Sequence, residues 1–389
     1  MRLCGATQHM DARLITTRWQ RFSPPRFSLR ATAPAGKRAG MTLRVHILTD
    51  VPARFFTRHA PGNKAKLGGV AFTFGLSLPQ DADAVIVYAR SRWTLPTHLP
   101  KARTAFVAGE PEEIHPYATR FLNQFGLVVA SVEKELQSER FYQTPPLTWF
   151  VGLNFEEPVP PLTLDDIANW EMPEKDDRIS IVTSRKATTP YQKQRLKLID
   201  HLKEAIPNRI VLYGREFNPV SDKKDALLPH RYHLALENTG AKWSWTEKLS
   251  DPLLCWALPF YVGCSNAETE LPPDAIYRID PTDPADAVKK MVTAIDAGLW
   301  QTRLTALQEA RRVLFTEQNV MALFARIAQR LCGQPDAAPA VTLRSEKSLP
   351  PEPGCRGSWP EMMLRRAALS VDPHLELRLA RRKARRAGH

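Results

Sequence analysis

The sequence predicts an α/β protein built from two doubly wound parallel sheets that face a cleft. Short β-branched runs alternate with helical stretches along most of the 389 residues, as in strands joined by crossover helices. A proline-rich stretch between Pro145 and Pro161 interrupts this alternation, and such stretches commonly join domains. Hydrophobic residues make up 43% of the chain, which is enough for two cores of ordinary size.

The predicted organisation has two domains, a linker and two flanking segments. The N-terminal extension is acid-poor and lacks an apolar signal region. Three interpretations stay open for it: an upstream start codon with Met41 opening the functional chain, a disordered arm, or a targeting segment. The expected segments are a basic extension at 1–40, an α/β acceptor domain at 41–150, a linker at 151–175, an α/β nucleotide-sugar domain at 176–333, and a Pro-rich and basic tail at 334–389.

Four apolar runs predict the strands of the first domain, at 43–48, 84–88, 104–108 and 127–130. The pair Asp81 and Asp83 resembles an acidic metal-binding motif. However, it precedes a strand, whereas ligands of parallel sheets gather where strands end. We therefore interpret it as a turn.

The second domain shows the same alternation after the proline-rich stretch. Its expected strands lie at 179–183, 210–213, 233–236 and 258–262. Its expected helices lie at 191–205, 246–256, 284–297 and 304–331.

Charge is concentrated at the two ends of the chain. Residues 1–40 hold eight basic residues and one acidic residue, and residues 375–389 hold six and one, so the ends carry +7 and +5 of the net +13. The part between is nearly neutral, which disfavours nucleic-acid binding. The basic C-terminus has two open interpretations, adhesion to an anionic membrane face or a solvated disordered tail. The tail is expected to be loose up to Pro353.

No apolar run is long enough for a membrane-spanning helix, and the five cysteines lack metal-binding spacing. Paired histidines with zinc-binding spacing are also missing from the sequence. We therefore expect a cytoplasmic protein, with peripheral attachment to the inner membrane face as an alternative, and no metal or other cofactor.

The most informative stretch lies between the third and fourth strands of the second domain. One strand ends at Glu237 and Asn238, and a helix is expected to begin near Thr246. The carboxyl edge of a parallel sheet and the N-terminus of a helix both favour anionic ligands. Lys248 adds a cation suited to a diphosphate, and Glu247 a carboxylate suited to ribose hydroxyls. Together these residues predict a sugar-nucleotide site that needs no metal.

The order of these residues resembles glycosyltransferase family 10, the α-1,3/1,4-fucosyltransferases of the bacterial type. The family signature is aromatic-x-x-x-x-Glu-Asn, then a short loop, then Thr-Glu-Lys, then Pro-x-x-x-Gly. Here Tyr232 precedes Glu237-Asn238, Thr246-Glu247-Lys248 follows, and Pro259 and Gly263 complete the pattern. The resemblance is strong over 179–280.

The resemblance implies a GT-B fold, GDP-fucose as donor, and inverting transfer of L-fucose to a glycan hydroxyl. A bacterial surface polymer such as lipopolysaccharide or capsule is the expected setting. The resemblance also implies that Arg195 contacts phosphate and that Lys223 precedes the site. Where the family has Tyr or Phe, this chain has Ser244 between Trp243 and Trp245, and a tryptophan is expected to supply the stacking surface. The predicted GDP-sugar site comprises Arg195, Lys223, Glu237, Asn238, Ser244, Trp245, Thr246, Glu247 and Lys248.

A carboxylate must take the proton of the acceptor hydroxyl, and Glu110 is the candidate base. It follows an apolar strand of the first domain, and the family carries a similar Gly-Glu there. Glu112 and Glu113 on the same loop are its alternatives. Two further functions stay open: the same fold using another GDP-sugar, or a non-catalytic relative that binds glycans or nucleotides.

Overall fold

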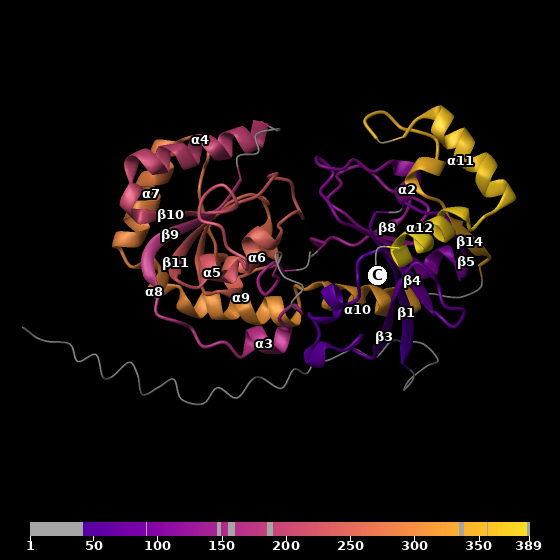
Figure 1. Ribbon diagram of the computed structural model, residues 1–389, viewed down its shortest axis with the longest axis horizontal. Coiled ribbons are helices and arrows are strands. Elements are labelled where there is room, and N and C mark those ends of the chain that lie inside the picture. The colour runs from indigo at the N-terminus through magenta and orange to yellow at the C-terminus, as the bar shows by residue number, and fades with distance from the viewer. Residues whose placement is uncertain are drawn as a thin grey trace, which may run out of the picture. The chain divides into compact units, whose positions relative to one another are not determined.

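The computed structural model describes residues 42–90, 92–145, 149–154, 160–184, 190–333, 338–355 and 357–386 (Figure 1). The predicted extension at 1–40 lies outside the described residues, as does part of the proline-rich stretch.

The first sheet has seven strands in the order β2-β3-β1-β4-β6-β7-β8. All neighbouring strands are parallel except β2 with β3. The four predicted strands are confirmed, and β3 was not predicted. The strands are β1 (Leu43–Leu48), β2 (Lys66–Leu67), β3 (Val70–Gly75), β4 (Ala84–Ala89), β6 (Thr104–Ala108), β7 (Leu127–Val129) and β8 (Glu139–Arg140). The acids before β4 form a turn, as expected: Asp83 accepts from the Arg44 backbone N–H, and Asp81 pairs with the Arg44 side chain.

Helices cover both faces of this sheet. On one face, α1 (Arg54–Thr57) and α10 (Val320–Cys332) share a core with the strands; on the other lie α2 (Thr119–Leu122) and α12 (Leu375–Arg386). The sequence predicted a single helix at 304–331 within the second domain. The chain instead breaks at Asn319, whose side chain caps α10 by accepting from the Ala322 N–H. As a result α10 packs on the first sheet, and only α9 (Leu304–Thr316) packs in the second core.

The C-terminal segment is folded against the first sheet, which corrects the expectation of a loose or disordered tail. Strand β14 (Ala340–Leu343) pairs antiparallel with β5 (Leu95–Pro100), and α11 (Trp359–Val371) follows. Leu343 and Leu377 are buried in the core on this face. Burial of these apolar side chains stabilises the folded segment, although its proline-rich composition is typical of a loose tail.

The second sheet has five parallel strands in the order β10-β9-β11-β12-β13. Its helices lie on both faces, and Figure 1 shows the strands between α4 and α9. The strands are β9 (Asp176–Val182), β10 (Ile210–Tyr213), β11 (His230–Leu236), β12 (Leu258–Val262) and β13 (Tyr277–Arg278). The remaining helices are α3 (Leu164–Ala168), α4 (Pro190–Ala205), α5 (Lys224–Leu227), α6 (Glu247–Leu254), α7 (Pro284–Asp296) and α8 (Leu299–Thr302).

Two doubly wound, mainly parallel sheets confirm the predicted α/β fold class. Within the described part of the chain, no helix is both long and apolar enough to cross a membrane.

Arg58, which follows α1, fixes the segment that leads from the first sheet to the second. Its buried guanidinium donates to the carbonyl oxygens of Trp149, Val151 and Leu162 at 2.9, 2.6 and 2.7 Å. Burial lowers the pKa of Arg58 to about 10, against the opposing effect of Asp251. Because backbone carbonyls take up its donors, Arg58 acts as a structural anchor of this segment.

Candidate functional site

The predicted strand-to-helix arrangement is present around Glu237. Strand β11 ends at Leu236, and the Glu237 side chain is buried directly beyond it. Its carboxylate accepts from the backbone N–H and the hydroxyl of Thr246, both at 2.7 Å. A Cβ at position 263 would lie 2.7 Å from the Cβ of Glu237, so only glycine fits there. Glu237 therefore ties the end of β11 to the start of α6.

Thr246 caps α6 by accepting from the Lys248 N–H, which places Glu247 and Lys248 in the first helical turn. The Lys248 ammonium lies 3.0 Å from Glu247 and 3.9 Å from Glu237. One cation thus bridges two buried carboxylates at a helix N-terminus.

Lys223 reaches the same cluster from the loop before α5. Its ammonium lies 3.1 Å from Asp251 and 3.7 Å from Glu247. Asp251 is buried and also accepts from the backbone N–H groups of Phe150 and Val151. Asp251 was not predicted from the sequence, although its place four residues after Glu247 puts both on one face of α6.

The two glutamates of the cluster have opposite pKa shifts. Burial raises the pKa of Glu237 to about 6, although Lys248 acts to lower it. Burial acts to raise the pKa of Glu247 as well, but Lys223 and Lys248 together lower it to about 2. Burial likewise acts to lower the pKa of Lys248, yet Glu247 and Glu237 raise it. The cluster therefore holds a firmly ionised Glu247 and a Glu237 that titrates near neutral pH.

Arg195 lies on α4, and its Nη2 donates to the Ser184 carbonyl at 3.4 Å. Burial lowers its pKa. Its charge acts to lower the pKa of Lys248, so the two cations influence the same region. Asn238 is half-buried at the edge of the sheet beside Glu237. The structure thus gathers the predicted cations and carboxylates around the N-terminus of α6.

The two other predicted residues occupy different roles. The Ser244 hydroxyl donates to the Ala241 carbonyl at 2.5 Å and so closes a turn of the loop. Trp245 is buried in the second core, and its indole N–H donates to Glu270 at 2.8 Å. The expectation that Trp245 contacts the donor is corrected by this burial, because neither face of the ring is open to a ligand. Trp243 instead lines a cavity.

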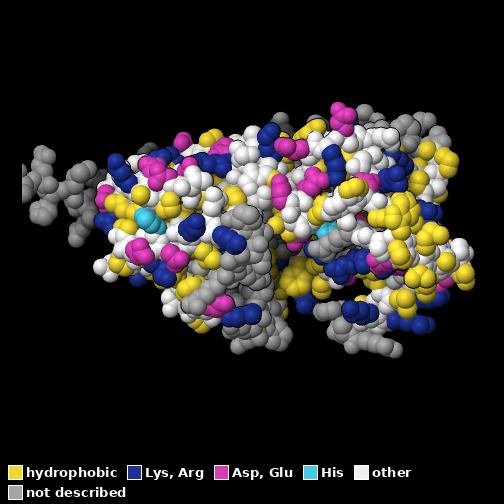
Figure 2. Space-filling view, turned by 90° about the horizontal axis from the view of Figure 1, so that it is seen from above, with side chains coloured by type: hydrophobic (Ala, Val, Ile, Leu, Met, Phe, Trp, Pro, Cys, Tyr) yellow, Lys and Arg dark blue, Asp and Glu magenta, His cyan; other side chains and the backbone are white. Residues whose placement is uncertain are grey.

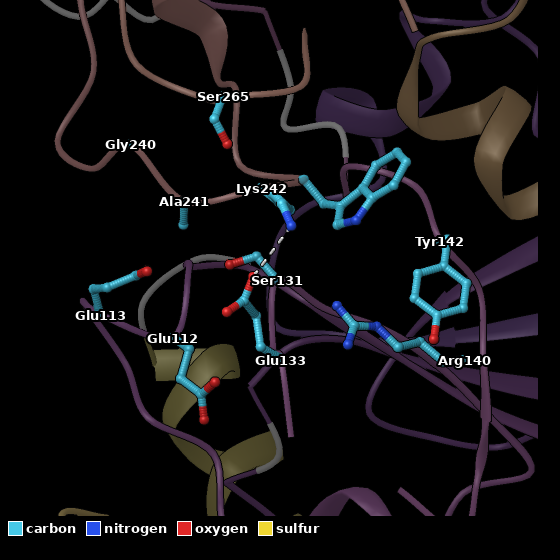
Figure 3. Close-up of a pocket in the computed structure, with 11 residues that line it drawn as sticks. Glu112, Glu113, Ser131, Glu133, Arg140, Tyr142, Gly240, Ala241, Lys242 and Ser265 are labelled. Carbon is cyan, nitrogen blue, oxygen red and sulfur yellow. Dashed lines mark ion pairs between the residues drawn. The ribbon is translucent and has the colours of Figure 1, made fainter. Parts of the chain in front are cut away.

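That cavity has a volume of about 760 Å³ and is lined by residues that follow strands of both sheets (Figure 3). Among its lining residues are Glu112 and Glu113, the alternatives to Glu110. Glu110 follows β6 as expected, but it lies 3.9 Å from the Arg90 guanidinium and is not among the residues described as lining the cavity. Glu112 pairs with Lys134 at 2.6 Å. Glu113 has no ion-pair partner among the described residues.

No protein-family model matches this chain, and no curated protein matches it. Among solved structures, it is similar to an α1,3-fucosyltransferase with GDP-fucose, at 14% identity and a TM-score of 0.44, over 75% of this chain and 92% of that one. A structure of an α1,3-fucosyltransferase with GDP has 15% identity and a TM-score of 0.45, over 76% of this chain and 93% of that one. A GtfA/B complex shows 12% identity and a TM-score of 0.35, over 66% and 54%. Likeness at this level does not bear on activity, which we infer from the site and from the sequence motif.

Proposed function

We propose that this protein is an inverting glycosyltransferase that transfers L-fucose from GDP-fucose to a glycan hydroxyl. The observation that carries the proposal is a cluster of two half-buried lysines and two buried glutamates at the carboxyl edge of β11 and the N-terminus of α6: Lys223, Lys248, Glu237 and Glu247. Cations and a helix N-terminus suit a diphosphate, and an ionised Glu247 suits ribose hydroxyls.

In the proposed reaction, the acceptor oxygen forms a bond to the anomeric carbon while the bond to the diphosphate oxygen breaks. The electron pair of that bond leaves with GDP, so negative charge grows on the diphosphate. Lys248 and Arg195, together with the dipole of α6, would stabilise this charge. The acceptor proton passes to a carboxylate of the first sheet, a step that commonly contributes about 10²–10⁴-fold in rate.

Glu110 remains our proposed base, with Glu112 and Glu113 as alternatives on one loop. Glu110→Gln, Glu112→Gln and Glu113→Gln form a matched series, since each removes one carboxylate at nearly constant size. Loss of the base should lower kcat by a hundredfold or more and leave GDP binding intact. Transfer at the wild-type rate in Glu110→Gln would exclude Glu110.

A thermal-shift screen against GDP, UDP and CMP tests the nucleotide. We expect the unfolding temperature to rise with GDP alone, and a rise with UDP but not GDP would contradict the proposal. Among GDP-sugars, turnover of GDP-fucose but not GDP-mannose would support fucose; the reverse would favour the same fold with another donor. GDP binding without transfer to any tested glycan would favour a non-catalytic binding protein.

We also propose that α11 and α12 contact an anionic membrane surface, such as the inner face of the membrane. Helix α11 carries exposed apolar side chains, including Trp359, Met363 and Leu364, and helix α12 carries exposed cations, including Arg378 and Arg382. Figure 2 shows hydrophobic side chains interspersed with Lys and Arg in this region. Apolar side chains framed by cations are typical of interfacial helices.

Co-sedimentation with vesicles tests this contact. We expect binding to vesicles that contain phosphatidylglycerol, weaker binding to phosphatidylcholine alone, and loss of binding in Trp359→Ser. Equal binding to both vesicle types would contradict an electrostatic contact.

A further inference from the structure

The cavity lies where strands of both sheets end. Glu113 follows β6, Ser131 follows β7, Trp243 follows β11, and Ser265 follows β12. Ligands of parallel sheets bind at this edge. The volume of about 760 Å³ falls within the roughly 300–1,000 Å³ of small-molecule sites. This cavity is therefore placed and sized for a ligand.

One loop connects the cavity to the charged cluster. The loop begins after Glu237 and ends at Thr246, and the hydrogen bonds between these two residues hold its ends together. Its tip, from Gly240 to Trp243, lines the cavity. In Figure 3, Ala241 and Lys242 lie across the cavity from Glu112 and Arg140. The cavity and the charged cluster are therefore joined by one short loop whose ends are hydrogen-bonded to each other.

Two polar atoms at the cavity are buried without partners. Ser131 is 7% exposed, and its hydroxyl has no hydrogen-bond partner among the described residues. Within the same described residues, the buried Nε of Arg140 also lacks one. Buried polar groups are normally satisfied. A rotation of either side chain toward the cavity would let a ligand supply the hydrogen bond that the atom lacks.

Two aromatic rings complete the wall. Tyr142 is 66% exposed, and its ring centroid lies 6.4 Å from that of Trp243. Trp243 has a φ of 57°, which is unusual for a residue with a side chain. The Asn266 side chain holds this conformation by accepting from the Trp243 N–H at 2.8 Å. A strained backbone held in this way presents the indole at the cavity.

The charges lining the cavity nearly balance. Glu112, Glu113 and Glu133 contribute three carboxylates, against the two cations Arg140 and Lys242. Lys242 lies 3.8 Å from Glu133, so their charges offset each other. The wall offers no surplus of cations, and an acidic ligand would meet the carboxylate of Glu113.

We propose that this cavity binds an uncharged sugar residue of the acceptor glycan. The sugar packs its apolar face against Trp243 and Tyr142, and its hydroxyls bond to Ser131, Arg140 and Glu113. This assignment rests on the proposed glycosyltransferase function and names the acceptor side of it. The shared loop then brings the acceptor hydroxyl next to the donor sugar, as a direct transfer requires.

The test is binding of the GDP-loaded, full-length protein to an array of neutral oligosaccharides and their sialylated counterparts. We expect wild type to retain neutral glycans. Trp243→Ala and Tyr142→Ala should weaken this binding at least tenfold, and Ser131→Ala severalfold. Met172→Ala removes an exposed apolar side chain that does not line the cavity, so it is the control and should bind as wild type does.

Unchanged glycan binding in the Trp243 and Tyr142 variants would overturn the proposal, as would a preference for the sialylated series or no glycan binding at all. GDP affinity is measured on the same proteins by calorimetry. It distinguishes a failure of the cavity assignment from a failure of the proposed donor site. GDP binding without glycan binding overturns only the cavity assignment, whereas glycan binding without GDP binding overturns the proposed function. Thermal unfolding of each variant confirms that it folds.

Discussion

Replacing Glu237 with glutamine should change how the stability of the protein depends on pH. Burial raises the pKa of Glu237 from 4.5 to about 6. The folded state therefore binds this proton more tightly than the unfolded state. The resulting stabilisation is complete below pH 4.5 and is lost as the pH rises through about 6. At roughly 1.4 kcal/mol per tenfold change in proton affinity, the loss amounts to about 2 kcal/mol.

Glu237→Gln carries no titrating group at this position. The unfolding free energy of the variant, relative to wild type, should therefore rise by about 2 kcal/mol between about pH 4 and pH 7.5. Any mismatch of the amide with the Thr246 donors is present at both ends of this range and cancels. Urea unfolding at intervals of pH measures the difference, and Glu171→Gln, at an exposed site, controls for the loss of one carboxylate.

A relative stability that stays constant across this range would refute burial as the cause of the raised pKa. A change of opposite sign would mean that Lys248 outweighs burial. Lys248→Met provides a second check, since removal of this cation should raise the pKa of Glu237 further and move the transition to higher pH.

Three further predictions concern the cluster, the C-terminal segment and the linking segment. Lys248→Ala should weaken GDP binding about tenfold to a hundredfold, as for a charge-assisted hydrogen bond of about 1.5–3 kcal/mol; calorimetry measures this, with the exposed Lys290→Ala as control. Glu352→Ala removes the acceptor of two backbone N–H groups at the start of α2, so we expect about 1 kcal/mol lower stability in urea and slower transfer with unchanged GDP affinity. Unchanged transfer would mean that the segment does not support the acceptor side. Arg58→Met leaves three buried carbonyls without their donor and should cost about 3 kcal/mol or more in urea unfolding; a loss no larger than that of the exposed Arg54→Met would contradict an anchoring role.

The C-terminal segment shows how a composition-based expectation failed. Its prolines and basic residues suggested a loose tail, yet Glu352 accepts from Thr119 and Arg120, and His115 lies 2.8 Å from Glu346. These contacts join residues more than two hundred positions apart. They hold the loop region that follows Glu110, so the segment supports the side of the site where the base is expected.

The pair Trp243 and Trp245 shows a second limit of prediction from the sequence. Trp245 was predicted to lie in the donor site, because it lies between the unusual Ser244 and Thr246. The structure instead buries Trp245, whose indole N–H donates to Glu270, and Trp243, which has a positive φ, lines the cavity. Both depend on partners more than twenty positions away, at Asn266 and Glu270.

The sequence alone determined the α/β class, most strand positions and the motif from Glu237 to Lys248. These features are local: strands alternate with helices, a cap begins a helix, and residues four apart share a helix face. Spacing along the chain therefore encodes them. Only the tertiary structure decided that α10 belongs to the first core, that Asp251 joins the charged cluster, and that Ser131 and Tyr142 share a cavity with Trp243. These relations depend on how two sheets and their connections pack, and no local pattern records contacts between residues so far apart in the chain.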